Sequence, residues 1–370
     1  MTGPIVVGAA LAQRPQRAGH AWMVLNWLAA FRRLGHDVVF ADRIDPTLGA
    51  VRAGVYWVAT TLGSLGVPWS VLLGDGSATG MPRRELLARA RGGVLVNVMG
   101  YLDDPQLMDV AARRVFLDID PGFGQAWQHA GLASVFVGHD AYATVGLNVG
   151  RAEGRVPDLG IEWITTLPPV DLDLWPASPP PSEGRFTTVA TWRGPFAPVE
   201  IDGVVHGLRV HEARRYRTLP STSGRSLEIA LDIDPGDGRD RDALLDGGWV
   251  LRDPRSVAGD VDAYRQYIQS SRGEFSIAKQ IYVSLRSGWF SDRSACYLAS
   301  GRPVVASDTG LAPHLPTGEG LLTFDGPESA EQALAEVHED ADRHTKAARQ
   351  IAEAHFDGRL VAARLLERAT

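Results

Sequence analysis

Short apolar runs alternate with segments of helical periodicity along the first half of the chain. Residues 5–10 form a run typical of a buried parallel strand, and apolar residues then recur at helical spacing over 24–31, before a helix stop at Gly35. The same rhythm predicts further strands at 38–41, 69–73, 93–98, 114–118 and 134–137, and helices at 55–62, 83–90 and 105–113. Such alternation predicts a parallel, doubly wound α/β sheet, which binds ligands at the carboxyl ends of its strands.

A proline-rich segment, LPPVDLDLWPASPPPSEGR at 167–185, interrupts this rhythm. Proline lacks a backbone donor and continues neither a helix nor a central strand, so we expect this segment to connect two domains. A second cycle follows, with predicted strands at 186–191, 227–233, 303–307 and 320–324, and helices at 211–219, 241–246, 261–271, 292–300 and across 329–369. The length of 370 residues, too long for one ordinary core, agrees with two α/β domains.

Charge, cysteine content and the length of apolar stretches exclude several classes of protein. The net charge is −7 and no run of Lys or Arg occurs, which argues against a nucleic-acid partner. Cys296 is the single cysteine, so an intrachain disulfide framework is excluded and a reducing compartment is favoured. The sequence shows no signal-peptide pattern and no apolar stretch of membrane-spanning length, and a soluble cytoplasmic protein is therefore expected.

Several catalytic motifs are missing from the sequence. It contains no P-loop, no Gly-x-Gly-x-x-Gly after the first strand, no Gly-x-Ser-x-Gly elbow and no His/Cys cluster with metal-ligand spacing. We therefore expect neither a bound metal nor a resident cofactor.

The stretch 287–305, SGWFSDRSACYLASGRPVV, carries the most chemical information. It predicts a loop, a short helix, a glycine stop and a buried strand; Ser291 suits the N-cap and Asp292 the first turn. A helix N-terminus behind a small-residue loop offers N–H groups to a diphosphate, and Arg286 and Arg293 are placed to bind its oxygens. The candidate diphosphate-binding residues here are Arg286, Ser287, Gly288, Ser291, Asp292 and Arg293.

In its turn Gly301-Arg302-Pro303-Val304, this stretch resembles GT-B glycosyltransferases. That family often carries an acidic residue five positions before the Gly of a Gly-x-Pro-Val turn, on the helix that faces the donor nucleotide, where it holds the ribose. Here that position is Cys296, and Asp292, one helical turn earlier, is the nearest acidic substitute. The resemblance therefore leaves the ribose contact open.

Most of residues 114–325 is also similar to a set of bacterial proteins labelled as glycosyltransferases. The shared phrases are "GEFSIAK", "SGWFSDRS", "YLASGRPVV" and "DTG" in the second half, and "DIDPGF", "GHDAYATVG" and "LDLW" in the first. The resemblance implies the GT-B fold, with two doubly wound Rossmann-like domains that face each other across a cleft. It further implies an acceptor-side domain at 1–167, a linker at 168–185, a nucleotide-sugar domain at 186–350 and a helix at 351–370 that crosses back to the first domain.

The first long helix also resembles the opening of many GT-B enzymes, with Gly-His at its start and Gly-His-x-Val at its end. His20 and His36 are 16 residues apart, as in that pattern. In inverting members the first His takes the proton of the acceptor hydroxyl, and an imidazole suits this task near neutral pH. Among Asp103, Asp118 and Asp120 we favour Asp118 as the carboxylate that orients His20. Retaining members share the helix without a base, so the stereochemical course stays open.

Four further groups of residues are candidates because they follow predicted strands. Arg193 follows the strand predicted at 186–191, and Lys279 ends a short strand predicted from Phe275; both are placed to contact the donor diphosphate. Residues 308–310 lie where the donor sugar is expected. His139 and Asp140, which follow the strand predicted at 134–137, are acceptor- or sugar-side candidates. The donor-side set is thus completed by Arg193, Lys279, Asp308, Thr309 and Gly310.

We therefore expect a metal-independent glycosyltransferase, with a nucleoside diphosphate sugar as co-substrate and a small-molecule or glycan hydroxyl as acceptor. A hexosyl or deoxysugar transferase is the preferred form of this prediction. A GT-B nucleotide-sugar epimerase or phosphorylase is one alternative. A non-catalytic GT-B-like binding or scaffold protein, which has lost its ribose carboxylate at Cys296, is the other.

Overall fold

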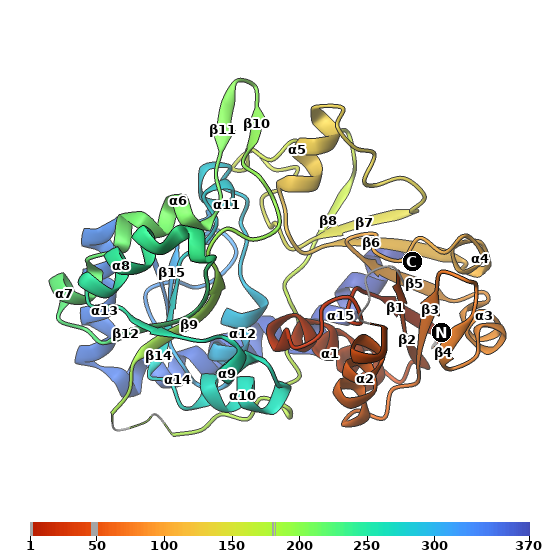
Figure 1. Ribbon diagram of the computed structural model, residues 1–370, viewed down its shortest axis with the longest axis horizontal. Coiled ribbons are helices and arrows are strands. Elements are labelled where there is room, and N and C mark those ends of the chain that lie inside the picture. Colours follow the sequence, from red (N-terminus) through yellow and green to blue (C-terminus); the bar gives the residue numbers. More distant parts are fainter. Residues whose placement is uncertain (1–2, 46–50, 180, 182) are drawn as a thin grey trace.

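The computed structural model describes residues 3–45, 51–179, 181 and 183–370, and Figure 1 shows its two α/β halves. The first half holds an eight-stranded sheet of order β4-β3-β2-β1-β5-β6-β7-β8, in which only β4 runs antiparallel to its neighbour. Its strands are β1 (Ile5–Gly8), β2 (Val38–Ile44), β3 (Trp69–Leu73), β4 (Ala78–Gly80), β5 (Val94–Val98), β6 (Arg113–Asp118), β7 (Ala141–Thr144) and β8 (Trp163–Thr165). Its helices are α1 (Ala18–Arg33), α2 (Val51–Gly63), α3 (Arg83–Ala90), α4 (Pro105–Val110) and α5 (Phe123–His129).

The second half holds a six-stranded, wholly parallel sheet of order β13-β12-β9-β14-β15-β16. Its strands are β9 (Phe186–Thr191), β12 (Leu227–Asp232), β13 (Val250–Arg252), β14 (Gly273–Ser276), β15 (Val304–Ser307) and β16 (Leu321–Phe324). A hairpin of β10 (Val199–Ile201) and β11 (Val204–His206) stands beside α5 at the top of Figure 1. The helices are α6 (Arg209–Ala213), α7 (Leu219–Ser223), α8 (Gly238–Asp246), α9 (Arg255–Ala258), α10 (Val261–Gln269), α11 (Gln280–Ser284), α12 (Asp292–Ala299), α13 (Pro327–Glu339) and α14 (Ala341–Ile351).

Helix α1 joins the two halves. It is apolar on all sides and is buried along most of its length, as expected of a helix with packing partners all round. It contacts the α10 and α12 helices of the second half as well as the C-terminal helix α15 (Gly358–Ala369). The Trp22 indole N–H donates to the Val261 carbonyl at 2.8 Å, so the N-terminal half of α1 is tied directly to α10.

The strand orders create one topological switch point in each sheet. In the first sheet the chain builds outward from β1 through β2 and β3, then returns to β5 on the other side of β1. In the second sheet it builds from β9 through β12 and β13, then returns to β14. Ligands of doubly wound sheets bind outside the carboxyl ends of the strands at such points. The loops after β1 and β5, and those after β9 and β14, are therefore the expected ligand positions.

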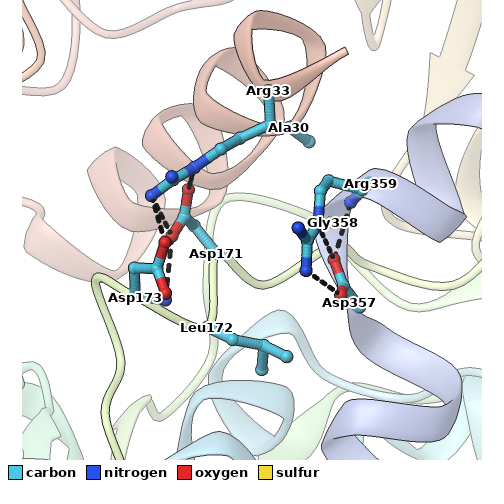
Figure 2. Close-up of a pocket in the computed structure, with 8 residues that line it drawn as sticks. All are labelled: Ala30, Arg33, Asp171, Leu172, Asp173, Asp357, Gly358 and Arg359. Atoms are coloured by element: carbon cyan, nitrogen blue, oxygen red, sulfur yellow. Dashed lines mark hydrogen bonds and ion pairs between the residues drawn. The ribbon is translucent and has the colours of Figure 1, made fainter.

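The chain crosses between the halves twice, and the two crossings pair with each other. Val170, in the proline-rich segment, donates to the Phe356 carbonyl at 2.8 Å, and its own carbonyl accepts from Gly358 at 2.9 Å. Figure 2 shows this junction, where Arg33 at the end of α1 is bonded to Asp171 and Asp173. After the crossing, α15 packs on α1, β7 and β8, which is the return toward the first half that the GT-B resemblance implies. The limits of the domains themselves stay a prediction.

The strand predicted at 134–137 is wrong. Of these residues only Phe136 is buried, Val137 is 73% exposed, and Gly138 has a φ of 88° that ends any extended run. The strand of this region is β7, which starts at Ala141. The helix predicted at 211–219 is also wrong in extent, because α6, a 3₁₀ turn and α7 replace it. Strands β4, β8, β10, β11 and β13 have no counterpart among the predicted elements.

Candidate functional site

An ion pair links the two halves where their strand ends meet. Asp120 lies in the turn after β6, and Lys279 lies between β14 and α11. The Lys279 Nζ donates to both oxygens of Asp120, at 2.8 and 2.7 Å. The Tyr282 hydroxyl, from α11, donates to the same carboxylate. A carboxylate of the first half is thus held by a cation and a phenol of the second.

The environment of Lys279 is largely apolar. Its Nζ lies 4.9 Å from the ring centre of Phe123, 5.5 Å from that of Phe196 and 5.2 Å from that of Tyr282. Burial lowers the pKa of Lys279, while the charge of Asp120 acts to raise it. Only 18% of the Lys279 side chain and 20% of the Asp120 side chain is exposed. The pair is therefore less screened by solvent than a surface ion pair.

Two arginines add positive charge around this pair. Arg209, in α6, donates to the Ile277 carbonyl, and burial, helped by the charge of Arg293, lowers its pKa to about 10. Arg14, in the loop after β1, donates to the Tyr101 hydroxyl at 2.8 Å, and its charge contributes to the lowered pKa of Lys279. The loops of both switch points thus supply side chains to one group. We call this group the interface cluster: Arg14, Tyr101, Asp120, Arg209, Lys279 and Tyr282.

His20, the predicted base, lies in the first turn of α1 near Arg14. Burial, and then the charge of Arg14, lowers the pKa of His20 to about 4, against a weaker effect of the Ala10 backbone. The imidazole is therefore neutral at pH 7. Its Nε2 atom is buried and has no hydrogen-bond partner within the described part of the chain. His20 is thus a weak base that still has a vacant hydrogen-bonding position.

The pairing predicted between Asp118 and His20 is wrong. One oxygen of the buried Asp118 accepts from the Gln125 amide and from the Thr144 hydroxyl, each at 2.8 Å, and the other accepts from the Asp120 backbone N–H at 3.0 Å. Burial raises the pKa of Asp118 to about 6, and these donors act against that rise. Asp118 organises the turn that carries Asp120 instead of orienting the histidine.

The loop at Ser287 and Gly288 is closed by contacts with the first half. The Gly288 N–H donates to the Thr309 carbonyl at 2.7 Å, and the Ser287 and Gly288 carbonyls accept from the backbone of Asn148 and Leu147. Gly288 has a φ of 70°, and a Cβ there would lie 2.8 Å from the Asn148 nitrogen. The prediction that this loop is an open diphosphate cradle is therefore wrong: its polar backbone groups pair with other backbone groups.

The predicted helix start at Ser291 is confirmed, but Arg293 in its first turn already has partners within the protein. Ser291 is the N-cap of α12 and accepts from the Arg293 N–H at 3.2 Å. Burial raises the pKa of Asp292 to about 6. The Arg293 guanidinium donates to the buried Glu274, to the Val189 carbonyl at 2.8 Å and to Ser276 at 3.1 Å. Arg293 thus ties β9 to β14, and only 10% of its side chain is exposed.

Cys296 occupies a position that α1 covers. Its Sγ accepts from the Asn26 side chain of α1 at 3.7 Å, and the residue is 1% exposed. A carboxylate at this position would be buried against α1, at the cost of desolvating its charge. The GT-B resemblance implies an acidic residue at position 296, and the packing of α12 on α1 gives a local reason for its absence.

The other donor-side candidates lie outside the interface cluster. Arg193 is paired with Asp237 at 2.5 Å, in an exposed position after β9. Arg286 lies 3.8 Å from Asp308, whose other oxygen accepts from the Gly310 N–H at 2.8 Å. Thr309 is buried and donates to the Trp289 carbonyl at 2.7 Å, and the Gly310 carbonyl accepts from the Asn148 amide at 3.1 Å. Among the donor-side candidates, only Lys279 belongs to the cluster.

His139 and Asp140 lie before a strand and not after one. Asp140 accepts from Arg114 at 2.7 and 2.9 Å, which joins the amino ends of β7 and β6. His139 lies edge-on to Phe116 and 3.1 Å from the Asn97 amide, and burial lowers its pKa. The prediction that this pair follows a strand end is wrong, because the strand starts after it.

A surface hollow lies near the cluster, at the carboxyl ends of β12 and β13. It is lined by residues 231–233, Arg241 and residues 251–255. At its edge, Asp232 accepts from Arg17, which precedes α1, at 2.7 Å. In the sheet, β12 is separated from β14 by β9 alone, so the carboxyl ends of these two strands are about 10 Å apart.

Sequence reasoning missed Arg14, Tyr101, Arg209 and Tyr282 as functional candidates. No motif contains them, and they are far apart in the sequence. The polar loop after the first predicted strand was one available signal, because the loop at a switch point is a ligand position whatever its motif. Arg209 and Tyr282 become candidates only when the fold brings α6 and α11 together.

No family model matches this sequence. No curated protein matches it either. Solved structures do match over the whole chain: Anabaena Alr3699/HepE in complex with UDP and glucose is 14% identical, covers 99% of both chains and has a TM-score of 0.55. A glycosyltransferase from Rickettsia africae ESF-5 is 11% identical over 100% of this chain and 98% of its own, with a TM-score of 0.52. The catalytic domain of starch synthase IV from Arabidopsis thaliana, bound to ADP and acarbose, is 12% identical over 99% and 98%, with a TM-score of 0.57.

These likenesses confirm the predicted architecture: the chain has the GT-B fold, with two doubly wound Rossmann-like halves. In the described residues, no helix combines the length and apolar character needed to cross a membrane.

Proposed function

We propose that this protein transfers a sugar, a hexose or a deoxysugar, from a nucleoside diphosphate sugar to an acceptor hydroxyl without a metal ion. The observation that carries the proposal is the interface cluster. Arg14, Arg209 and Lys279 supply three cationic side chains, and Asp120 supplies the one carboxylate among the six members. This excess of positive charge lies between the switch points of two facing sheets, where the fold rule expects a ligand. A diphosphate carries negative charge, which would balance the excess of positive charge in this cluster.

The donor would lie along the carboxyl edge of the second sheet. Its diphosphate would contact Lys279 and Arg209, and its nucleoside would reach the hollow beyond β12, about two strand spacings away. Arg241 lines that hollow and makes no ion pair or hydrogen bond within the described residues, so it is available to a base or ribose. In this arrangement Arg241 would take the place of the ribose contact that the GT-B resemblance implies from α12. On α12 that position is Cys296, which faces α1.

The chemistry needs charge stabilisation at the leaving group. When the bond from the anomeric carbon to the diphosphate oxygen breaks, negative charge grows on the diphosphate, and fixed cations in a partly buried site stabilise it. Lys279 and Arg209 are placed for this role in the second half. The acceptor would approach from the first half beside His20, whose neutral imidazole would accept a hydrogen bond from the attacking hydroxyl once its buried Nε2 is uncovered.

The solved structures with the same fold support this proposal by what they bind. Anabaena HepE was solved with UDP and glucose, and Arabidopsis starch synthase IV with ADP and acarbose. Their nucleotides differ, so the likeness favours a nucleoside diphosphate without selecting its base.

A thermal-shift panel tests the proposal. The protein is titrated with UDP, dTDP, GDP and ADP and with their common sugar conjugates, because a ligand that binds only the native state raises the Tm. We expect one nucleotide series to stabilise the protein and its sugar conjugate to release the nucleoside diphosphate when an acceptor is added, with or without EDTA. Conversion of the conjugate without acceptor would instead indicate an epimerase. No stabilisation by any series would support the binding or scaffold alternative and overturn the proposal.

A further inference from the structure

We propose that Asp120 acts as a built-in competitor of the donor: its carboxylate occupies the cation site that the donor diphosphate must take, and it thereby sets donor affinity. This inference rests on the proposed function for the identity of the ligand. The contact itself is independent of that identity, because both oxygens of Asp120 are bonded to Lys279 in the structure.

The charges of the cluster favour such an exchange. With Asp120 in place, one negative charge faces Arg14, Arg209 and Lys279, and the cluster keeps an excess of positive charge. A diphosphate carries more negative charge than one carboxylate, so it satisfies the same cations better. Since Lys279 is mostly buried, a diphosphate that left Asp120 in place would meet an unscreened like charge. Displacement of Asp120 is therefore the favourable outcome, and it has a cost that lowers the affinity for the donor.

The turn that carries Asp120 allows its side chain to leave. The backbone N–H of Asp120 is held by Asp118, and Asp118 is held in turn by Gln125 and Thr144. None of these bonds involves the Asp120 carboxylate. The side chain can therefore rotate away from Lys279 while the turn, β6 and the start of α5 stay in place.

The bond to Lys279 also crosses between the two halves of the molecule. Asp120 belongs to the first sheet, whereas Lys279 and Tyr282 belong to the second. The same contact that competes with the donor thus also holds the two halves together at this edge. A donor that replaces Asp120 would keep the second half's cations occupied and free a carboxylate on the acceptor side.

The test measures ligand binding to purified variants by calorimetry, with inorganic pyrophosphate and with the nucleoside diphosphate selected by the panel. The variants are Asp120→Asn, which keeps the shape and removes the charge, Lys279→Ala, and both together. Asp262→Asn, which disrupts an ion pair with Arg265 on α10, is the matched control. The Tm of each variant shows that it is folded.

We expect Asp120→Asn to bind both ligands about tenfold more tightly than the wild type, and Asp262→Asn to match the wild type. In the Lys279→Ala background, the Asp120→Asn change should have a smaller effect than in the wild type, because the competition for Lys279 is then absent. Equal or weaker binding by Asp120→Asn would overturn the inference even if the wild type binds nucleotides well. Tighter pyrophosphate binding with no nucleotide binding would support the inference and contradict the proposed function. Binding of neither ligand to either protein would contradict both.

Discussion

The stretch at 287–305 and the interface cluster make opposite use of polar residues. In the stretch, the loop N–H and C=O groups pair with other backbone groups, and Arg293 is fully engaged by Glu274, Val189 and Ser276. In the cluster, three cations face one carboxylate, and the ion pair of Lys279 and Asp120 is within reach of both switch points. The polar groups of the recognisable motif at 287–305 therefore stabilise the fold. The excess of positive charge in the interface cluster instead favours binding of an anionic ligand.

The largest change in the free energy of unfolding is expected for Arg293→Ala. The change leaves Glu274 buried and without its cation, and breaking a buried pair on one side costs about 3–5 kcal/mol. Urea unfolding followed by circular dichroism measures this loss. If Arg293→Ala instead kept the wild-type stability and lost nucleotide binding, the stretch would be the binding site after all.

A smaller effect is expected from the pH dependence of stability. The pKa of His20 is about 4 in the folded protein and near 6.5 in an unfolded chain, so protonation favours unfolding. Its contribution is present above pH 6.5 and is lost as the pH falls toward 4, by up to about 2 kcal/mol between pH 7 and 5. The variant His20→Gln should lose this dependence.

Three buried carboxylates act in the opposite direction, so the comparison needs the variant. Burial raises the pKa of Asp42 to about 7 and the pKa values of Asp118 and Asp292 to about 6. Their contributions are full below pH 4 and are lost as the pH rises through 6 and 7. The difference between wild type and His20→Gln, measured as unfolding free energy at pH 7, 6 and 5, isolates the histidine. Parallel curves for the two proteins would mean that His20 is exposed to solvent.

The smallest effect is expected for Arg17→Ala. Arg17 joins the two halves through Asp232, as Lys279 does through Asp120, but 55% of the Arg17 side chain is exposed. An exposed pair of this kind contributes less than about 1 kcal/mol, and salt screens it. The unfolding free energy should change little, and even less in high salt. A loss as large as that of Arg293→Ala would show that exposed contacts hold the two halves together.

The sequence predicted the fold well because strand–helix rhythm is a local property. Residues 69–73, 83–90 and 186–191 were placed as the structure has them, and Ser291 was recognised as an N-cap. The error at 134–137 has a tertiary cause: the buried Phe136 lies against Phe116 and Trp163, which gives an apolar run without a strand.

The candidate site was predicted only in part, because the cluster is assembled by the fold. Lys279 was identified from its position after a strand, and Asp120 was one of three carboxylates considered for another role. Their contact joins residues 159 apart in the sequence, which no motif records. The stretch at 287–305 drew attention because its helix start resembles an anion site. Whether a helix start is open depends on what packs against it, and here residues 147 and 148 do.

The proposed function depends above all on binding of the donor diphosphate by Lys279 in the interface cluster. Lys279 and Lys346 are the lysines of this sequence, and Lys346 lies exposed in α14, so Lys279→Ala and Lys346→Ala form a matched pair. The measurement is the affinity of each variant for the nucleoside diphosphate that stabilises the wild type. The account predicts at least a thirtyfold weaker affinity for Lys279→Ala, about 2 kcal/mol, and wild-type affinity for Lys346→Ala. Equal affinity for the two variants would contradict it.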